Sequence, residues 1–416
     1  MRKAGRFTAA LLLIAVGAAV ITDRYAGTQI TGLLIEWWPV LFIALGLEYI
    51  FFNSKYGDGG KQLKLDLGGV IFAVLISAVV IGSTQSADSF RNLFGQMKPG
   101  GSIGSIMSGE GHKFEKPKVA IDVPASLDRI SVINRSSGNV SVKPGSTDQV
   151  QVEMVVYVTG DETEAASIAE QTALKQEMNG SKLQLIAEGK EYSFGPWMQK
   201  RPAIDIVITV PAQIQVDMDF EMSNGKFKAE QLTFKKDLKV RTTNGEIEVS
   251  SLTGNLDLES TNAAIKSLKT KGLLQLETTN GSIEVDSHQG DARIKSTNGR
   301  LKTADVTGSI QSETTNGGIV IADALKDVRA HTTNGNVDIV SRNVGGNWDV
   351  ETSHGRITLK LPSTGDYKVK GNGKRDDIVT SLPLRISKDK IEGSVGSGRN
   401  EIKLNTNGSI VIEKAD

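Results

Sequence analysis

Short stretches of alternating apolar and polar residues dominate the chain from about residue 118 onward. In stretches such as Ile247 to Val249 and Leu256 to Leu258, apolar side chains occupy every second position, which places them on one face of a β-strand. Between about 222 and 361, two such strands fall within every 18 residues. The pattern predicts a repeating β-structure with two strands per unit and one strand face turned inward.

An Asn marks one corner of each repeat. A Thr or Ser and then a Thr precede it, and the next residue is Gly, except for Ala263. A fixed period with one side chain at one corner is typical of stacked solenoid rungs, in which identical amides form a ladder. An antiparallel meander with Asn-Gly hairpins is the alternative, but it has no reason to keep one turn sequence at one interval. The predicted turn ladder comprises Asn244, Asn262, Asn280, Asn298, Asn316 and Asn334.

Weaker copies of the pattern flank the regular array. The stretch 161–178 places Ala, Ile and Leu on one side of a helix that Asn179 and Gly180 would end. Such a helix would cover the open end of a solenoid and protect its edge strand. We therefore expect a two-sided β-solenoid over 118–416, with regular rungs over about 222–361 and one capping helix.

Three apolar runs, over about 7–22, 33–52 and 67–83, precede the repeats. Their length and composition predict three transmembrane helices in a lipid bilayer. Three basic residues precede the first run and three precede the third, whereas one lies between the first and second. The positive-inside rule then places the N-terminus in the cytoplasm and the solenoid outside, in a multi-pass cell-membrane protein. The Gly- and Ser-rich stretch 84–117 is typical of a flexible tether.

The composition argues against several classes of function. The 416 residues include 48 basic and 48 acidic residues and no Cys, and a neutral balance argues against a nucleic-acid partner. The histidines, His112, His288, His331 and His354, fall in unrelated settings, and the position four residues after each ladder Asn changes between Glu, Lys, Val and Asp. We therefore expect no catalytic set, no metal site, no cofactor and no enzymatic activity.

Two surfaces are candidates for contact with a partner. Outward columns, such as the one through Asp257, Arg293 and Arg329, change sign along the stack and contain no aromatic row. This predicts a solvated face with ion pairs between rungs. The loop 190–202 combines aromatic and basic residues, as interaction hot spots do, although its rings could instead cap the solenoid. The candidate contact residues in this loop are Tyr192, Phe194, Trp197 and Arg201.

Residues 119–416, with their repeated Thr-Asn-Gly corners and glycine-rich ending before Asn407, resemble the putative-adhesin family of bacterial β-solenoids that includes LiaG-like proteins. Residues 1–83, with Trp37, Trp38 and Pro39 leading into an apolar run, resemble the LiaF-type transmembrane region. The resemblance implies a Gram-positive cell-envelope protein linked to envelope-stress signalling, with a sensor kinase as partner. The alternative is a surface adhesin or a protein that binds a cell-wall polymer.

Overall fold

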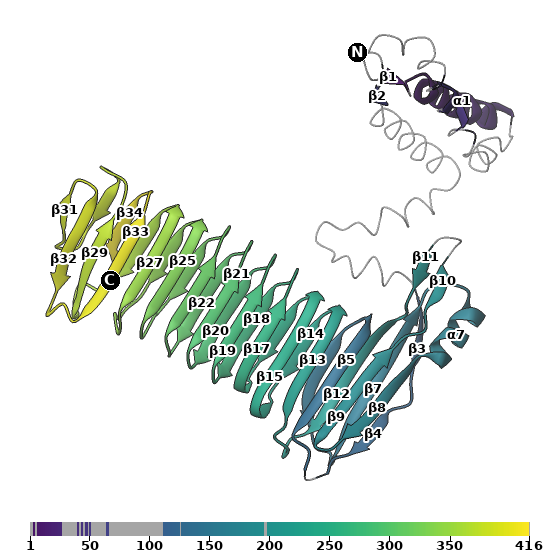
Figure 1. The fold of residues 1–416 in the computed structure, drawn as a ribbon, viewed down its shortest axis with the longest axis horizontal. Coiled ribbons are helices and arrows are strands. Elements are labelled where there is room, and N and C mark those ends of the chain that lie inside the picture. Colours follow the sequence, from purple (N-terminus) through teal and green to yellow (C-terminus); the bar gives the residue numbers. More distant parts are fainter. Residues whose placement is uncertain are drawn as a thin grey trace. The chain divides into compact units, whose positions relative to one another are not determined.

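The computed structural model describes residues 3–4, 6–26, 40, 43–44, 46–48, 50, 64–65, 111–124, 126–194 and 198–415. They belong to two compact units, Met1–Ser102 and Ile103–Asp416. Figure 1 shows the elements of both units.

The described residues of the first unit include a long helix, α1 (Arg6–Ala26), and a short parallel pair of strands, β1 (Lys3–Ala4) and β2 (Lys64–Leu65). The Glu48 carboxylate accepts hydrogen bonds from the backbone N–H and the hydroxyl of Thr8, at 2.8 and 2.6 Å, in the first turn of α1. No helix in the described part of the chain is long and apolar enough to cross a membrane. The predicted run 67–83 and most of 33–52 and of the tether lie outside the described residues.

The second unit is a β-solenoid, as the 18-residue period predicts. From β15 to β26 each strand pairs in parallel with the strand two elements before it and two after it. This pairing excludes the antiparallel meander, because a meander joins consecutive strands. The strands form two faces joined at the corners, which we call sheet A and sheet B, and the stacked rungs are visible in Figure 1.

Both sheets run along the solenoid axis. In spatial order, sheet A contains β8 (Ala173–Asn179), β9 (Lys182–Glu188), β5 (Arg129–Ser137), β13 (Asp217–Asn224), β15 (Thr233–Asn244), β17 (Thr253–Ser260), β19 (Leu274–Thr278), β21 (Ala292–Ser296), β23 (Ile310–Thr314), β25 (Val328–Asn334), β27 (Trp348–His354), β33 (Asn400–Thr406), β29 (Tyr367–Asn372), β32 (Lys390–Val395) and β31 (Arg385–Ser387). Sheet B contains β3 (His112–Glu115) and β4 (Val119–Asp122), which both pair with β7 (Gln149–Val158), followed by β12 (Ala203–Pro211), β6 (Val140–Gly145), β14 (Phe227–Glu230), β16 (Ile247–Ser250), β18 (Ile265–Lys271), β20 (Ile283–Gln289), β22 (Leu301–Val306), β24 (Ile319–Ala322), β26 (Val337–Val340), β28 (Ile357–Leu361), β34 (Ile410–Lys414) and β30 (Ile378–Thr380).

Alternation within each strand builds the core. In register, Leu238, Leu256 and Leu274 stack on three successive strands of sheet A, and all three are buried. Since the intervening residues point to solvent, each strand contributes one row to the core and one row to an outer face. The register therefore fixes which residues line each face.

The two ends depart from sequential order. At the C-terminal end, β33 lies between β27 and β29, and β34 lies between β28 and β30. At the other end, β5 lies between β9 and β13, and β6 between β12 and β14. Antiparallel pairs β8–β9, β7–β12 and β29–β32 close the ends, so the regular rungs offer no open edge.

The capping helix is shorter than the sequence predicts. Helix α7 spans Glu162–Gln171, with Asp161 as its N-cap. Its continuation to 178 is wrong because Thr172 is extended and the next seven residues form β8, which pairs antiparallel with β9. Gly180, at φ 61°, makes the hairpin turn between these strands rather than ending a helix. Helix α7 packs beside β7 and β3.

Candidate binding face

The Asn corner is a continuous hydrogen-bonded ladder. Each ladder Asn donates its side-chain N–H to the side-chain oxygen of the Asn one rung earlier, at 2.7 to 2.9 Å. The first bond ends on Asn224, whose own amide donates to the Ser137 hydroxyl at 3.3 Å. The amides predicted to form the turn ladder thus bond along one line and stabilise the stacked turns.

Hydroxyl groups and glycines complete the same corner. The Thr314 and Thr332 hydroxyls donate to the carbonyls of Gly299 and Gly317, one rung earlier, at 3.1 and 2.9 Å. A Cβ at Gly317 would lie 1.9 Å from the Gly299 carbonyl oxygen, so close approach of the backbones requires glycine here. The repeated corner residues are therefore occupied in holding the rungs together.

The opposite corner uses a conformation that the sequence pattern does not reveal. One residue per rung adopts a positive φ of 51° to 59° without being glycine. These residues have no common side chain, so the repeat carries no signature of the turn. They are Gln231, Ser251, Lys269, Ser287, Asp305 and Asp323.

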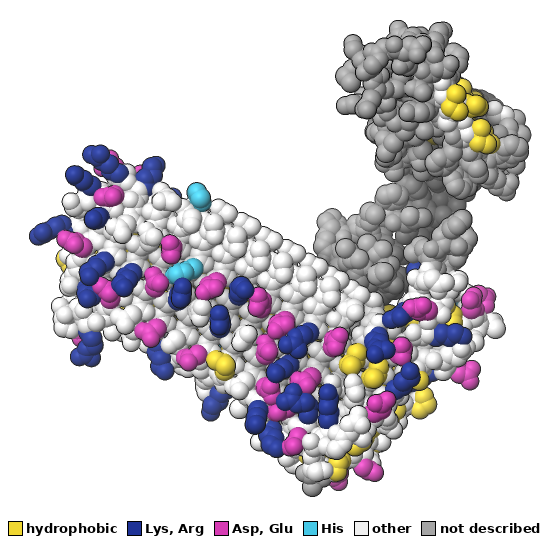
Figure 2. Space-filling model, viewed as in Figure 1, with side chains coloured by type: hydrophobic (Ala, Val, Ile, Leu, Met, Phe, Trp, Pro, Cys, Tyr) yellow, Lys and Arg dark blue, Asp and Glu magenta, His cyan; other side chains and the backbone are white. Residues whose placement is uncertain are grey.

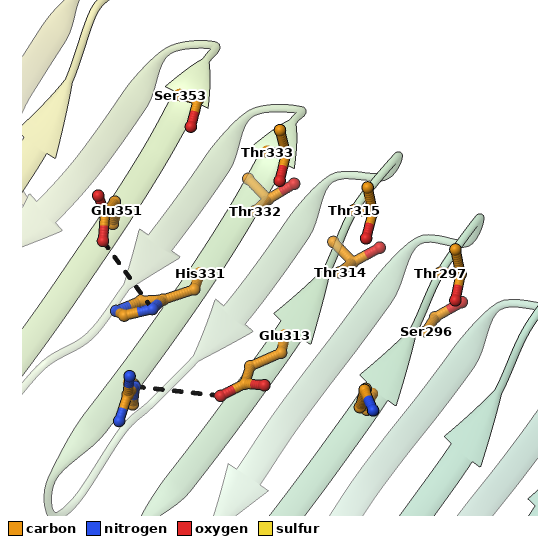
Figure 3. A pocket seen from close by; sticks show the side chains of 12 residues that line it. Ser296, Thr297, Glu313, Thr314, Thr315, His331, Thr332, Thr333, Glu351 and Ser353 are labelled. Atoms are coloured by element: carbon orange, nitrogen blue, oxygen red, sulfur yellow. Dashed lines mark ion pairs between the residues drawn. The ribbon is translucent and has the colours of Figure 1, made fainter.

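The outer face of sheet A carries two shallow depressions that share Arg329. One spans β21 to β27 near the Thr-Asn corner, where Lys295, Glu313, His331 and Glu351 line it together with Thr and Ser side chains (Figure 3). The other lies toward the strand starts, over Arg293 and its neighbours on β23 and β25. Figure 2 shows charges of both signs over the broad face and an uncharged edge along the solenoid.

Ion pairs link successive rungs of this face. Lys295 lies 3.0 Å from Glu277, and Arg329 lies 4.0 Å from Glu313. His331 contacts Asp349 at 3.2 Å. All of these side chains are partly or largely exposed, so the pairs contribute little to stability and remain available to a second surface.

On sheet A, Arg293 and Asp257 have no such link to a described residue. The Arg293 side chain is exposed and makes no ion pair or hydrogen bond with any described residue. One carboxylate oxygen of Asp257 is buried without a hydrogen-bond partner. Burial, and after it the neighbouring Glu259 carboxylate, raise the pKa of Asp257 above its ordinary value. Both groups would gain from an opposite charge supplied from outside.

The contact loop predicted at 190–202 is in part structural. Strands β10 (Tyr192–Phe194) and β11 (Met198–Lys200) form an antiparallel pair. Tyr192 is buried in the core and its hydroxyl accepts a hydrogen bond from the Thr159 N–H at 3.2 Å, so as an exposed contact residue this prediction is wrong. Arg201 is exposed and donates to Glu191 at 3.0 Å. Trp197 and the Phe194 side chain lie outside the described residues.

The histidines do not converge on a site. His288 is buried, and its Nδ1 lies 2.9 Å from the Thr270 hydroxyl. Burial lowers the pKa of His288, while nearby backbone groups and Asp291 oppose the shift. In the part of the chain that the structure describes, no group of acidic, His or Cys side chains could hold a metal ion.

Stacked parallel rungs, hydrogen-bonded corners, capped ends and a broad polar face define a β-solenoid domain. The chain belongs to the Toastrack DUF4097 family, whose model matches residues 159–413.

Among solved structures, three proteins are similar to this chain at low sequence identity. A putative adhesin from Parabacteroides merdae is 14% identical, covers 61% of this chain and 97% of its own, and has a TM-score of 0.30. A putative adhesin from Bacteroides fragilis is 10% identical, with 73% and 98% covered and a TM-score of 0.26. A putative lipid-binding protein from Parabacteroides distasonis is 12% identical, with 73% and 97% covered and a TM-score of 0.24. A search of curated proteins finds no match.

Proposed function

We propose that the protein is a non-enzymatic module of the cell envelope whose solenoid binds or scaffolds a macromolecular partner through the outer face of sheet A. The N-terminal apolar runs would anchor it in the cell membrane, and the charge distribution around them favours a solenoid on the outer side. The partner would then be another envelope component.

The depressions on sheet A carry this proposal. Both are shallow, and the one near the Thr-Asn corner is polar and extends over four strands from β21 to β27. A small-molecule site is usually a concave, mostly apolar cavity, whereas a broad polar surface with Arg side chains suits a macromolecule. Because the corners and ends are occupied by contacts within the chain, a sheet face is the natural surface for this role.

Two more specific forms of this proposed function rest on different observations. The resemblance of residues 1–83 to a LiaF-type region favours a regulatory role, with a membrane sensor kinase bound by the anchor and envelope stress as the signal. Arg293 and Arg329 lie in one column two strands apart, about 9.6 Å given the usual strand spacing. Because Arg binds carboxylates and phosphates, this pair favours the alternative of an adhesin for an anionic wall polymer.

The first test is the location of the solenoid. Intact cells that carry the C-terminally tagged protein are treated with protease and blotted for the tag, with lysed cells as the control. Loss of the tag from intact cells is expected. Survival in intact cells and loss in lysed cells would overturn the proposed location.

The second test asks whether the outer face of sheet A is the surface that binds. Full-length protein with Lys295→Glu and Arg329→Glu on sheet A is compared with Lys266→Glu and Lys302→Glu on sheet B for binding to washed envelope fragments. We expect the sheet A variant to lose binding and the sheet B variant to keep it. Equal binding by both variants would contradict a role for sheet A.

A further inference from the structure

The outward charges of sheet A form stripes across the strands. On the two central outward columns, each strand from β17 to β29 carries charges of one sign. In spatial order the strands are β17 (acidic), β19 (acidic), β21 (basic), β23 (acidic), β25 (basic), β27 (acidic), β33 (basic) and β29 (basic). The residues are Asp257 and Glu259, Glu277, Arg293 and Lys295, Glu313, Arg329 and His331, Asp349 and Glu351, Lys403, and Lys370.

This order reverses sign about its own midpoint, between β23 and β25. Strand β23 is acidic where β25 is basic, and β21 is basic where β27 is acidic. The outer pairs, β19 with β33 and β17 with β29, are also opposite. An isologous dimer sets each surface element opposite its symmetry mate, so sign reversal about one line is what such an interface requires.

We infer that the outer face of sheet A binds a second copy of this chain, face to face, around a twofold axis that runs parallel to the strands between β23 and β25. This deepens the proposed function, on which it rests, by naming the partner of the same face. The twofold keeps each residue at its place along the strand and exchanges strands across the midpoint. Position for position, Arg293 then faces Asp349 of the other copy, and Lys295 faces Glu351.

The match extends beyond these pairs. Glu313 faces His331 of the other copy, and Asp257 faces Lys370. Glu277 faces Asn405. The third outward column, from Asn255 to Lys368, also sets no like charges opposite one another. Arg293 and Asp257, whose side chains make no ion pair or hydrogen bond with a described residue of their own chain, each receive one.

At neighbouring positions, the twofold axis would set strands of like charge opposite one another. An axis between β21 and β23 would oppose β17 to β27, which are both acidic. An axis between β25 and β27 would oppose β21 to β29, which are both basic. An axis between β19 and β21 would oppose β17 to β23, again both acidic. Since like charges across an interface suppress pairing, the charges on these eight strands favour the axis between β23 and β25 over these three alternatives.

The size of the face suits a modest dimer. Eight strands about 4.8 Å apart, each exposing about five residues at roughly 3.3 Å, give roughly 600 Å² per copy, somewhat below the ~800 Å² of a standard interface. The contacts are ionic and exposed, so salt screens them. We expect a dimer that dissociates as ionic strength rises.

A charge exchange tests the arrangement. Full-length protein in detergent is examined by analytical ultracentrifugation at low salt, as wild type, Arg293→Glu, Asp349→Arg and the double variant. Each single variant places two like-charge contacts in every dimer, so its Kd rises about tenfold or more. The double variant restores both contacts and returns to within about threefold of wild type. An equimolar mixture of the two single variants forms a heterodimer for the same reason.

Lys302→Glu on sheet B is the matched control and keeps the wild-type Kd. A monomeric wild type, or a double variant as weak as the single variants, would overturn the dimer. Binding to envelope fragments is measured separately. If sheet A variants still lose that binding while wild type is monomeric, the face serves another partner and the proposed function stands.

Cross-linking places the axis. The chain has no cysteine, so a single introduced thiol reacts only with its counterpart. Gln311→Cys lies beside the axis, whereas Gln275→Cys lies more than 20 Å from its counterpart, given about 4.8 Å per strand. A short bis-maleimide should couple Gln311→Cys and leave Gln275→Cys single. The reverse result, or equal coupling, would contradict this axis.

Discussion

The Asn corner and the outer face of sheet A belong to the same rungs but follow opposite rules. At the corner the same side chains recur, and their amides and hydroxyls bond to the rung before. On sheet A the outward residues change from strand to strand, and the Arg293 side chain bonds to none of the described residues. What repeats builds the solenoid, and what varies distinguishes one position on its surface from another.

The largest loss of unfolding free energy should come from adding a side chain at a corner glycine. A Cβ at Gly317 would lie 1.9 Å from a backbone oxygen, whereas at the adjacent Gly318 its nearest neighbour is 3.4 Å away. Gly317→Ala should cost on the order of 3 kcal/mol of unfolding free energy or more, and Gly318→Ala about 1 kcal/mol or less. Urea unfolding of the two variants makes the comparison. Similar losses would mean that the corners are not closely stacked.

The loss of unfolding free energy on removing a ladder Asn should depend on its position in the ladder. Asn316 takes part in two ladder bonds, and Asn334 in one. At about 1 kcal/mol per bond, Asn316→Ala should cost about 2 kcal/mol and Asn334→Ala about half as much. Equal losses in unfolding free energy would indicate that the bonds do not act as a ladder.

Lowering the pH should reduce the unfolding free energy, because His288 is buried in the core. Since its pKa is lowered in the folded protein, the unfolded chain binds the proton more readily, and stability falls as pH drops below the ordinary value of about 6.5. Val306 occupies the same inward column one rung later, so His288→Val suits the site. The variant should lose less stability than wild type between pH 7.5 and 5.5. Parallel losses in unfolding free energy would exclude His288 as the source.

The smallest effect on stability should come from the faces. Lys295→Glu on sheet A and Lys302→Glu on sheet B each remove one exposed ion pair, so each should change the unfolding free energy by about 0.5 kcal/mol or less. Thermal unfolding checks this. A large loss for Lys295→Glu alone would make the sheet A charges structural and weaken their role in binding.

The sequence predicts the solenoid because its period is visible residue by residue. Asn298 and its counterparts set the register, and the register sets which residues point outward. The helix boundary at Gln171 is not predictable in this way, because pairing with β9 overrides the local helical pattern of 173–178. Tyr192 is misjudged because aromatic residues serve both cores and contacts.

The sign reversal on sheet A is hidden from the sequence for a topological reason. Lys403 and Lys370 lie on strands outside the regular 18-residue period, and β33 lies between β27 and β29. The sequence pattern therefore does not say which outward column, or which place in the stack, these two lysines occupy. The candidate face therefore required the strand order at the C-terminal end, which no repeat in the sequence announces.

The central claim is that partners meet the solenoid on sheet A. Lys295, Asn298 and Lys302 lie within one rung on sheet A, the Asn corner and sheet B, and all three are exposed. A photo-cross-linking residue is placed at each position in turn in the full-length protein in intact cells, and adducts are resolved by blotting. We expect a strong, discrete adduct from position 295 and little from 298 or 302. Adducts mainly from 302 or 298, or equally from all three, would contradict the account.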